Sequence, residues 1–484
     1  MMRPVFRAIF KAKLPIALSV LFISSAEAVL LFDDGNVHTL RGAVFDNVLL
    51  ENGSDLIIEN GLVLPSSDDP AVTANSNSVM LRQYAAAIGG IRSDYGEVSL
   101  MGNTLVIGTG EESSTTTPFG RAGVGGANQV TVDGRALIAG ASHTTHGGMG
   151  IANYSSGGQQ VTLNSGYVFG GSSAELGGSG IGLIGFGESL DLSVNGGSVI
   201  GGNGGVQGGN GIGREAQISE DMSGQISGGY IAGGYGGERG GHALSSSLSS
   251  NHLNVTGGMF LGGNGGQIGG NALNLTFYSD DSVDVAISGG VFDAGFGDLD
   301  DGWLMDLSGF ASPLNPNHNV EIAGGLFGSN NSGRGINIAN GGVVDVYGND
   351  LSFTDGLLSG YLSDGHWIET LVSLGTDSSA GTLNLHNSSG YAARTGLVDS
   401  ETTPLMPFVE GRYVAGPDPV AERLAEASGF FGIDNLVASR YEEHVGRYEP
   451  SSVPEPSTLL LFSIGILGLG MFQMKAPRKG SKST

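Results

Sequence analysis

Short alternations of apolar and polar residues recur along the middle of the chain at nearly constant intervals. In each copy, two apolar residues two positions apart precede a turn, a second apolar patch and a glycine, as in VTLNSGYVFGG from Val161 and LSVNGGSVIGG from Leu192. Alternation with a period of two is typical of half-buried strands, and glycine supplies the turns between them. Each copy therefore predicts two short strands joined at a corner.

One apolar anchor position defines eight copies of this pattern, spaced 29 to 35 residues apart. Glycine follows the anchor by two positions in seven copies, and a large apolar residue follows it by five positions in all eight. The anchors are Leu100, Val132, Leu163, Val194, Ile226, Val255, Ile287 and Ile322. The residues five positions later are Leu105, Leu137, Val168, Val199, Ile231, Phe260, Phe292 and Phe327. This regular period indicates a repeat architecture.

A third apolar patch lies about eighteen residues after the anchor, at positions such as Ile181, Ile212 and Leu273. Three strands and three turns in about 31 residues form one coil of an all-β, right-handed parallel β-solenoid, in which like residues stack about 4.8 Å apart. A helical repeat is disfavoured because each glycine costs a helix about 1 kcal/mol relative to alanine. A bundle of glycine-rich extended helices is the other alternative, suggested by GGNGGVQGGNG (201–211). That run lacks side chains for a core, so we interpret it as a loop between the second and third strands.

The repeat divides the chain into segments. We expect an N-terminal cap or first coils over 29–97, the solenoid over 98–351, and degenerate coils or a C-terminal cap over 352–401. Residues 402–450 predict a stalk with a short helix, because Val420, Leu424 and Ala427 have helical spacing. The remaining segments, 1–28 and 451–484, carry signals of a different kind.

The N-terminal segment has the three parts of a secretory signal peptide. Its cations Arg3, Arg7, Lys11 and Lys13 precede an apolar stretch that is too short to span a bilayer, and Ala26-Glu27-Ala28 follows. Small residues in this arrangement are what signal peptidase requires. We therefore expect signal peptidase to cleave after Ala28 as the chain is exported.

The C-terminal segment combines a proline motif, an apolar run and a basic tail. Residues 458–474 form a mostly apolar stretch of 17 residues, which as a helix would span about 25 Å and serve as a short transmembrane helix. The tail 475–484 would keep its cations on the cytoplasmic side and stop transfer. These cations are Lys475, Arg478, Lys479 and Lys482. Directly before the apolar run stand Val453, Pro454, Glu455, Pro456 and Ser457.

This tail resembles the PEP-CTERM sorting signal of Gram-negative bacteria, over about 25 residues. The resemblance implies that exosortase, a membrane protease found alongside exopolysaccharide gene clusters, recognises the signal. It also implies transport across the inner membrane, transient anchoring there, and a final location at the cell surface or in the extracellular matrix.

Charge and composition exclude some classes of partner and some kinds of chemistry. The formal net charge is −26, and no lysine occurs between Lys13 and Lys475. An acidic chain repels phosphates, which excludes nucleic acid as a partner. The sequence contains no cysteine, so disulfides and thiol chemistry are excluded as well.

Candidate chemistry is sparse. Asp298, Asp300 and Asp301 in GDLDDG are the candidate calcium ligands, although the full spacing of a calcium loop is absent. His143 and His146 resemble a metal pair but lack an acidic neighbour in sequence, so a glycine-rich loop is the simpler interpretation. We expect no other cofactor and no catalytic residue.

We therefore predict a non-catalytic surface or biofilm-matrix protein, either adhesin-like or associated with exopolysaccharide or another surface glycan. The alternative is a polysaccharide lyase or hydrolase, because β-solenoids also host such enzymes. The two differ in whether acids and bases gather on adjacent coils.

Overall fold

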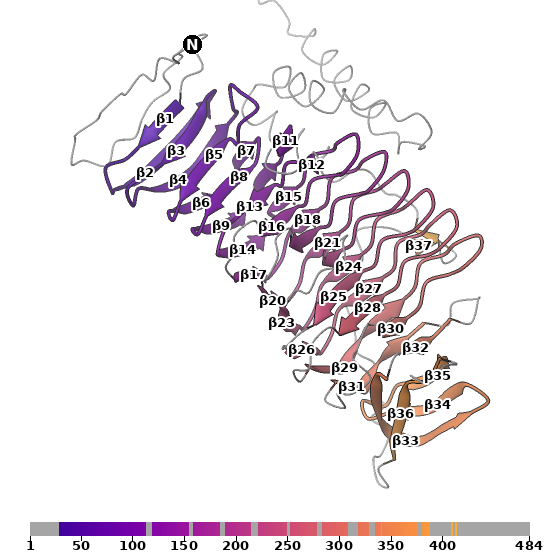
Figure 1. Ribbon diagram of the computed structural model, residues 1–484. Coiled ribbons are helices and arrows are strands. Elements are labelled where there is room, and N and C mark those ends of the chain that lie inside the picture. Colours follow the sequence, from indigo (N-terminus) through magenta and orange to yellow (C-terminus); the bar gives the residue numbers. More distant parts are fainter. Residues whose placement is uncertain are drawn as a thin grey trace, which may run out of the picture.

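The structure is a computed structural model that describes residues 29–112, 119–153, 158–183, 189–213, 221–248, 252–277, 283–307, 318–328, 334–339, 341–375, 380–387, 408–409 and 412–413. All regular secondary structure in these residues is β-strand. Figure 1 shows the strands stacked rung upon rung into an elongated rod, from β1 at one end to β33–β36 at the other. The all-β, mainly parallel solenoid that the repeat predicts is confirmed.

Three rows of parallel strands run along the rod. The first row contains the anchors: β2 (Val37–Val44), β4 (Asp55–Val63), β6 (Ser78–Arg82), β9 (Glu97–Gly102), β14 (Gln129–Gly134), β17 (Gln159–Leu163), β20 (Ser189–Val194), β23 (Asp221–Ile226), β26 (His252–Val255), β29 (Val283–Asp293), β31 (His318–Phe327), β33 (Val343–Thr354) and β36 (Thr382–Asn387). The second row consists of the ends of β2, β4, β29 and β31 with β7 (Ala85–Ile88), β10 (Thr104–Ile107), β15 (Leu137–Ala139), β18 (Tyr167–Phe169), β21 (Ser198–Ile200), β24 (Tyr230–Ala232) and β27 (Met259–Leu261). The third row consists of β1 (Val29–Phe32), β3 (Asn47–Leu50), β5 (Val72–Asn75), β8 (Ile91–Asp94), β13 (Val124–Gly125), β16 (Ile151–Asn153), β19 (Ile181–Leu183), β22 (Ile212–Gly213), β25 (Leu244–Leu248), β28 (Leu273–Phe277), β30 (Met305–Leu307), β32 (Ile336–Ile338) and β35 (Trp367–Ser373).

The eight anchors form one internal column. Each pairs in parallel register with the next, from Leu100 with Val132 to Ile287 with Ile322, and all are at most 1% exposed. The column continues at both ends through Leu40, Ile58 and Leu81 and through Val346 and Leu385. Twelve steps of about 4.8 Å make the rod about 58 Å long.

The apolar residues predicted five positions after each anchor form a second column inside the rod. This column departs from the predicted spacing in its first two copies. Val168 pairs in sequence with Val199, Ile231, Phe260, Phe292 and Phe327, but Tyr167 and not Val168 pairs with Leu137. The inward residues of the two earlier coils are therefore Val106 and Ile138, six positions after their anchors. The corner in those coils is one residue longer, and the pleat turns Leu105 and Leu137 outward.

Each coil of about 31 residues consists of a shorter basic coil, like those at the N-terminal end, with a loop inserted into it. In the N-terminal coils, only Gly89 and Gly90 separate β7 from β8, whereas residues 170–180 separate β18 from β19. Accordingly the anchors Ile58, Leu81 and Leu100 are 23 and 19 residues apart. The insertions are the glycine-rich loops that the sequence places between the second and third strands.

The glycines of these loops allow two backbone arms to pack against each other. The Gly171 amide donates to the Gly148 carbonyl of the preceding coil at 2.7 Å, and the Gly178 amide donates to Gly171 at 2.8 Å within its own loop. This alternation between and within loops continues through Gly202, Gly209, Gly234, Gly241, Gly263, Gly270, Gly295 and Gly302. The sequence predicts that such runs are loops, and close approach of the backbones is what requires glycine in them.

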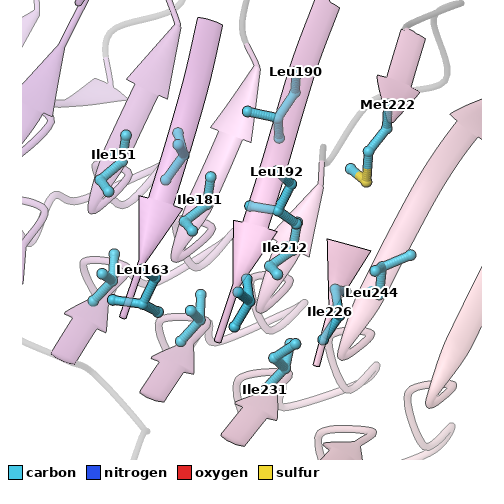
Figure 2. Packing of buried hydrophobic residues seen from close by; sticks show 14 of the residues in the cluster. Ile151, Leu163, Ile181, Leu190, Leu192, Ile212, Met222, Ile226, Ile231 and Leu244 are labelled. Atoms are coloured by element: carbon cyan, nitrogen blue, oxygen red, sulfur yellow. The ribbon is translucent and has the colours of Figure 1, made fainter. Parts of the chain in front are cut away.

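The true corners lie after the anchor strands. Gly197 and Gly229 take positive φ angles of 78° and 90° there, which suit glycine. Inside the rod, side chains from all three rows form a continuous core, part of which Figure 2 shows at Leu163, Ile181 and Ile231. Phe260, Phe292 and Phe327 stack along this core with ring centroids 4.9 and 5.0 Å apart.

An antiparallel insertion ends the rod. β33 pairs with β34 (Leu357–Leu362), which pairs with β35, both antiparallel. The inner face of this hairpin extends the core through Leu358, Leu362 and Ile368. Two short hairpins complete the β-structure: β11 (Glu111–Glu112) with β12 (Phe119–Gly120), and β37 (Phe408–Val409) with β38 (Arg412–Tyr413).

Candidate functional site

The outward side of the anchor strands is polar over most of the rod. Because side chains alternate along a strand, the residues between the buried anchors point away from the core. One such row contains Ser99, Thr131, Thr162, Ser193, Gln225, Asn254, Ala286, Glu321, Asp345 and Asn384. A second row contains Glu97, Gln129, Gln160, Asp191 and Ser223. We call these rows, with the corner residues beside them, the outer polar face.

Side chains on the outer polar face bond from coil to coil. Gln160 donates to Asp191 at 3.2 Å and lies 3.4 Å from the donor nitrogen of Gln129. At the corner, Asn195 donates to Asn164 at 2.9 Å and accepts from Ser227 at 3.0 Å. These contacts hold neighbouring amides and hydroxyls in line along the rod, so donors and acceptors repeat at the spacing of the coils.

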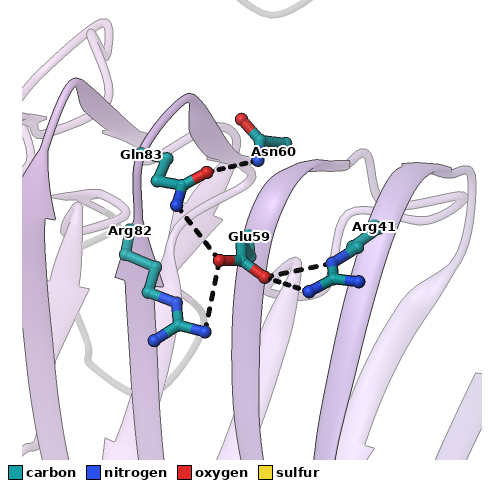
Figure 3. Close-up of polar contacts among 5 residues, drawn as sticks. All are labelled: Arg41, Glu59, Asn60, Arg82 and Gln83. Atoms are coloured by element: carbon teal, nitrogen blue, oxygen red, sulfur yellow. Dashed lines mark hydrogen bonds and ion pairs between the residues drawn. The ribbon is translucent and has the colours of Figure 1, made fainter. Parts of the chain in front are cut away.

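A cationic cluster lies at the N-terminal end of this face (Figure 3). The Glu59 carboxylate accepts from Arg41 Nε at 3.0 Å and from Gln83 Nε2 at 3.1 Å, and it lies 3.2 Å from Arg82. The side chains of Arg41 and Arg82 are 58% and 42% exposed, whereas that of Glu59 is 10% exposed. The hydrogen bond from Arg41 is the main reason that the pKa of Glu59 lies below its usual value. One carboxylate thus holds two guanidinium groups that are both partly exposed to solvent.

The three aspartates of the GDLDDG loop have different surroundings. Asp300 forms an ion pair with Arg334, whose guanidinium lies over the Trp303 ring at 5.1 Å. Asp301 is buried and accepts from the Gly297 amide at 3.0 Å. Asp298 is exposed. In the part of the chain that the structure describes, no group of three or more acidic or histidine residues is arranged to hold a metal. Calcium binding here therefore stays a prediction that this arrangement does not favour.

The His143–His146 pair has an acidic neighbour that the sequence does not reveal. His143 Nε2 lies 3.1 Å from the Glu111 carboxylate, and its Nδ1 accepts from the Thr145 amide at 3.2 Å. Glu111 belongs to the preceding coil, 32 residues away in sequence. Only an alignment of the two coils could have found this pair, and the β11–β12 hairpin that carries Glu111 does not follow the repeat.

A ladder of side chains also connects the glycine-rich loops. Asn210 accepts from the His242 amide, His242 Nδ1 accepts from the Asn271 amide, and Asn271 accepts from the Trp303 amide, at 2.8 to 2.9 Å. Burial lowers the pKa of His242 to about 4, although this residue keeps partial contact with solvent. Burial also raises the pKa of Asp293, to which the charge of Asp301 contributes. The side chains of Asn210, His242 and Asn271 thus join successive coils.

The signals at the two ends lie outside the described residues. This holds for the cleavage residues Ala26 and Ala28, the motif Val453 to Ser457, the four stop-transfer cations and the predicted transmembrane helix. Of the predicted stalk, only 408–409 and 412–413 are described. Among the residues that are described, the structure contains no helix long and apolar enough to cross a membrane.

Comparison with known proteins addresses the C-terminal signal directly. Residues 452–475 match the family model of the PEP-CTERM protein-sorting motif. The match contains the Pro-Glu-Pro triplet, the apolar run and the first cation of the tail. No curated protein and no solved structure matches the chain. The sorting signal is thus confirmed, and it makes the protein an exported substrate of exosortase.

Proposed function

We propose that the protein is a non-catalytic component of the cell surface or extracellular matrix, whose rod binds a glycan chain along the outer polar face. The observation that carries this proposal is the pair of aligned rows of hydroxyl, amide and carboxylate side chains on consecutive coils. Such groups are the donors and acceptors that complement sugar hydroxyls. Their order favours a linear, hydroxyl-rich polymer over a compact ligand.

The affinity for a glycan chain would come from the repetition of equivalent polar side chains on consecutive coils. A single amide or hydroxyl contact contributes little, because each replaces a bond to water. A straight face with equivalent groups every ~4.8 Å lets one chain engage several coils together, which multiplies weak contacts. The contacts between Gln160 and Asp191 and between Asn164 and Asn195 fix these side chains before binding. Less conformational entropy is then lost when the polymer docks.

The cationic cluster adds a preference for acidic groups at one end of the face. The chain has a formal net charge of −26, so most of its surface repels an anionic polymer. Arg41 and Arg82 are exposed, and both pair with the single carboxylate of Glu59 among the described residues. Guanidinium groups bind carboxylates and sulfates with two parallel N–H bonds. We expect a uronate or sulfated sugar to be accepted here, and neutral sugars along the remaining coils.

The test uses the processed protein recovered from its host and the exopolysaccharide of the same host. Gln160→Ala, Asn164→Ala and Asn195→Ala in one variant should weaken co-sedimentation with the polymer at least tenfold. The matched control carries Ser352→Ala and Ser359→Ala in the antiparallel β33–β34–β35 insertion, which we call the hairpin cap. The two hydroxyls bond to each other there, and this variant should bind normally. Equal binding by both variants would remove the outer polar face from the proposal.

The same samples separate binding from catalysis. A lyase or hydrolase shortens the polymer and creates new chain ends, so viscosity would fall with time in the presence of the protein. We expect constant viscosity over hours with bound protein present. A steady loss of viscosity that survives repurification would favour the polysaccharide enzyme.

A further inference from the structure

An apolar stripe lies on the outside of the second row of strands, away from the core. Its residues alternate with the inward residues Val63, Ala87, Val106 and Ile138, so they point outward. We call them the outer apolar face: Ala43, Phe45, Leu62, Leu64, Ala86, Ile88, Leu105, Ile107, Leu137, Ala139, Tyr167 and Phe169. The eight central members are only 0 to 4% exposed. An outward face with so little solvent contact needs a second layer over it.

The dimensions of the outer apolar face are well defined. It begins at the coil of Ala43, and after Phe169 the outward positions become mixed, with Ser198 and Tyr230. Five steps between its six coils give a length of about 24 Å, and two outward residues on one strand lie about 7 Å apart. This is the outline of one helix of about 16 residues, which rises about 24 Å along its axis.

No apolar side chain from another described element packs on this face. Within the described residues, the hydrophobic cluster consists only of side chains from the second row of strands and the positions directly after them. A contiguous apolar surface of this size left open on a secreted protein would promote association and aggregation. The cover must therefore be another part of the chain or another molecule.

We propose that residues 418–447, between the rod and the sorting signal, form an amphipathic helix that packs on the outer apolar face. The two segments with longer apolar runs, 14–24 and 458–474, belong to signals that export is expected to remove. Residues 418–447 remain in the mature chain. Ile433, Val437, Tyr441 and Val445 repeat every four positions, which gives an apolar stripe about 18 Å long on a helix. The whole segment is long enough for the helix of about 16 residues that the face requires.

The connecting chain is long enough for this return. From the coil of Leu385 back to the coil of Val132 is eight steps, or about 38 Å. Residues 388–407, which precede the β37–β38 hairpin, can by themselves extend to about 66 Å. The sorting signal that follows residue 447 would then leave the molecule beside the N-terminal coils. The rod would thus be held at that end during sorting, with the hairpin cap of Tyr361 and Trp367 pointing outward.

Cysteine labelling tests the proposal cleanly because the chain has no native cysteine. Ala86→Cys places a thiol in the centre of the outer apolar face, and Thr131→Cys places one on the outer polar face as the accessible reference. In the processed protein we expect maleimide to label position 86 at least tenfold more slowly than position 131. Adding Ile433→Glu and Val437→Glu, both on the apolar stripe, should bring the two rates together, whereas Glu443→Gln on the far side of the helix should change nothing.

Disulfide crosslinking tests whether the segment and the face lie close together. Ala86→Cys with Val437→Cys should crosslink within one chain, and Leu326→Cys, exposed at the far end of the rod, should not crosslink with Val437→Cys. Rapid labelling of position 86 in the unmodified segment would overturn the proposal. So would slow labelling that persists after the glutamate substitutions: a dimeric mass would then identify a second copy as the cover, and a monomeric mass another segment.

Discussion

The carbonyl oxygen of Gly178 occupies the place where a β-carbon on Gly170 would have to lie. Gly170 and Gly178 stand on the two arms of one glycine-rich loop, and equivalent pairs, such as Gly201 with Gly209 and Gly233 with Gly241, repeat in the following coils. The contact is backbone to backbone, so no side-chain movement can relieve it. The loops are therefore a close-packed layer of the rod.

Gly170→Ala should destabilise the rod strongly. The added methyl group must separate two hydrogen-bonded arms, and we expect the free energy of unfolding to fall by about 3 kcal/mol or more. Chemical denaturation followed by circular dichroism measures the loss. Gly342→Ala is the control, because a β-carbon there meets nothing closer than 3.3 Å. Similar stability of the two variants would show that the arms can separate at little cost.

Phe292→Ala should open a cavity in the aromatic stack. Phe292 is fully buried between Phe260 and Phe327, with ring centroids 4.9 and 5.0 Å away. Removing a buried phenyl ring costs about 3–5 kcal/mol. Phe327→Ala, at the end of the stack and partly exposed, should cost clearly less. Denaturation midpoints give both values, and a reversed order would contradict the stacking account.

His242 should make stability depend on pH. The burial that lowers its pKa from 6.5 to about 4 means that, between these values, the unfolded chain binds a proton that the folded chain excludes. Stability is complete above pH 6.5 and declines as the pH falls towards 4. We expect a loss of about 2 kcal/mol, less than the full shift would give, because the ring keeps some solvent contact.

His242→Asn isolates this effect. Its neighbours in the ladder, Asn210 and Asn271, already use asparagine to accept a backbone amide from the next coil. The variant keeps an acceptor and removes the titrating ring, so its melting temperature should fall less between pH 7 and pH 4.5. Parallel curves for the variant and the natural protein would assign the pH dependence to other groups.

Replacing both Pro454 and Pro456 by Ala should block processing of the sorting signal. The prolines keep the peptide before the apolar run extended, where a protease at the membrane surface can read it. We expect mass spectrometry to find surface protein that ends near residue 456 in the natural chain, and membrane-bound protein that ends at Thr484 in the variant. A host without exosortase should reproduce the variant. An intact Thr484 on surface protein from the natural host would contradict this account.

The sequence by itself determined the coils, the anchor column and the sorting signal. Leu100 to Ile322 could be aligned from spacing alone, because in a parallel solenoid each residue lies beside its equivalent in the next coil. The repeat in the sequence therefore defines which residues pair between neighbouring coils. The sorting signal could be identified for a simpler reason: its motif, apolar run and cations are contiguous in the chain.

Only the tertiary structure decided what the corners and loops do. One extra corner residue turned Leu105 and Leu137 outward, onto the outer apolar face, although both match the repeat pattern. The partners Arg41 and Arg82 of Glu59, and Glu111 of His143, come from neighbouring coils at positions without a repeated signature. A pattern within one coil fixes which residues are buried. Which side chains and backbone groups meet depends on how one coil lies upon the next.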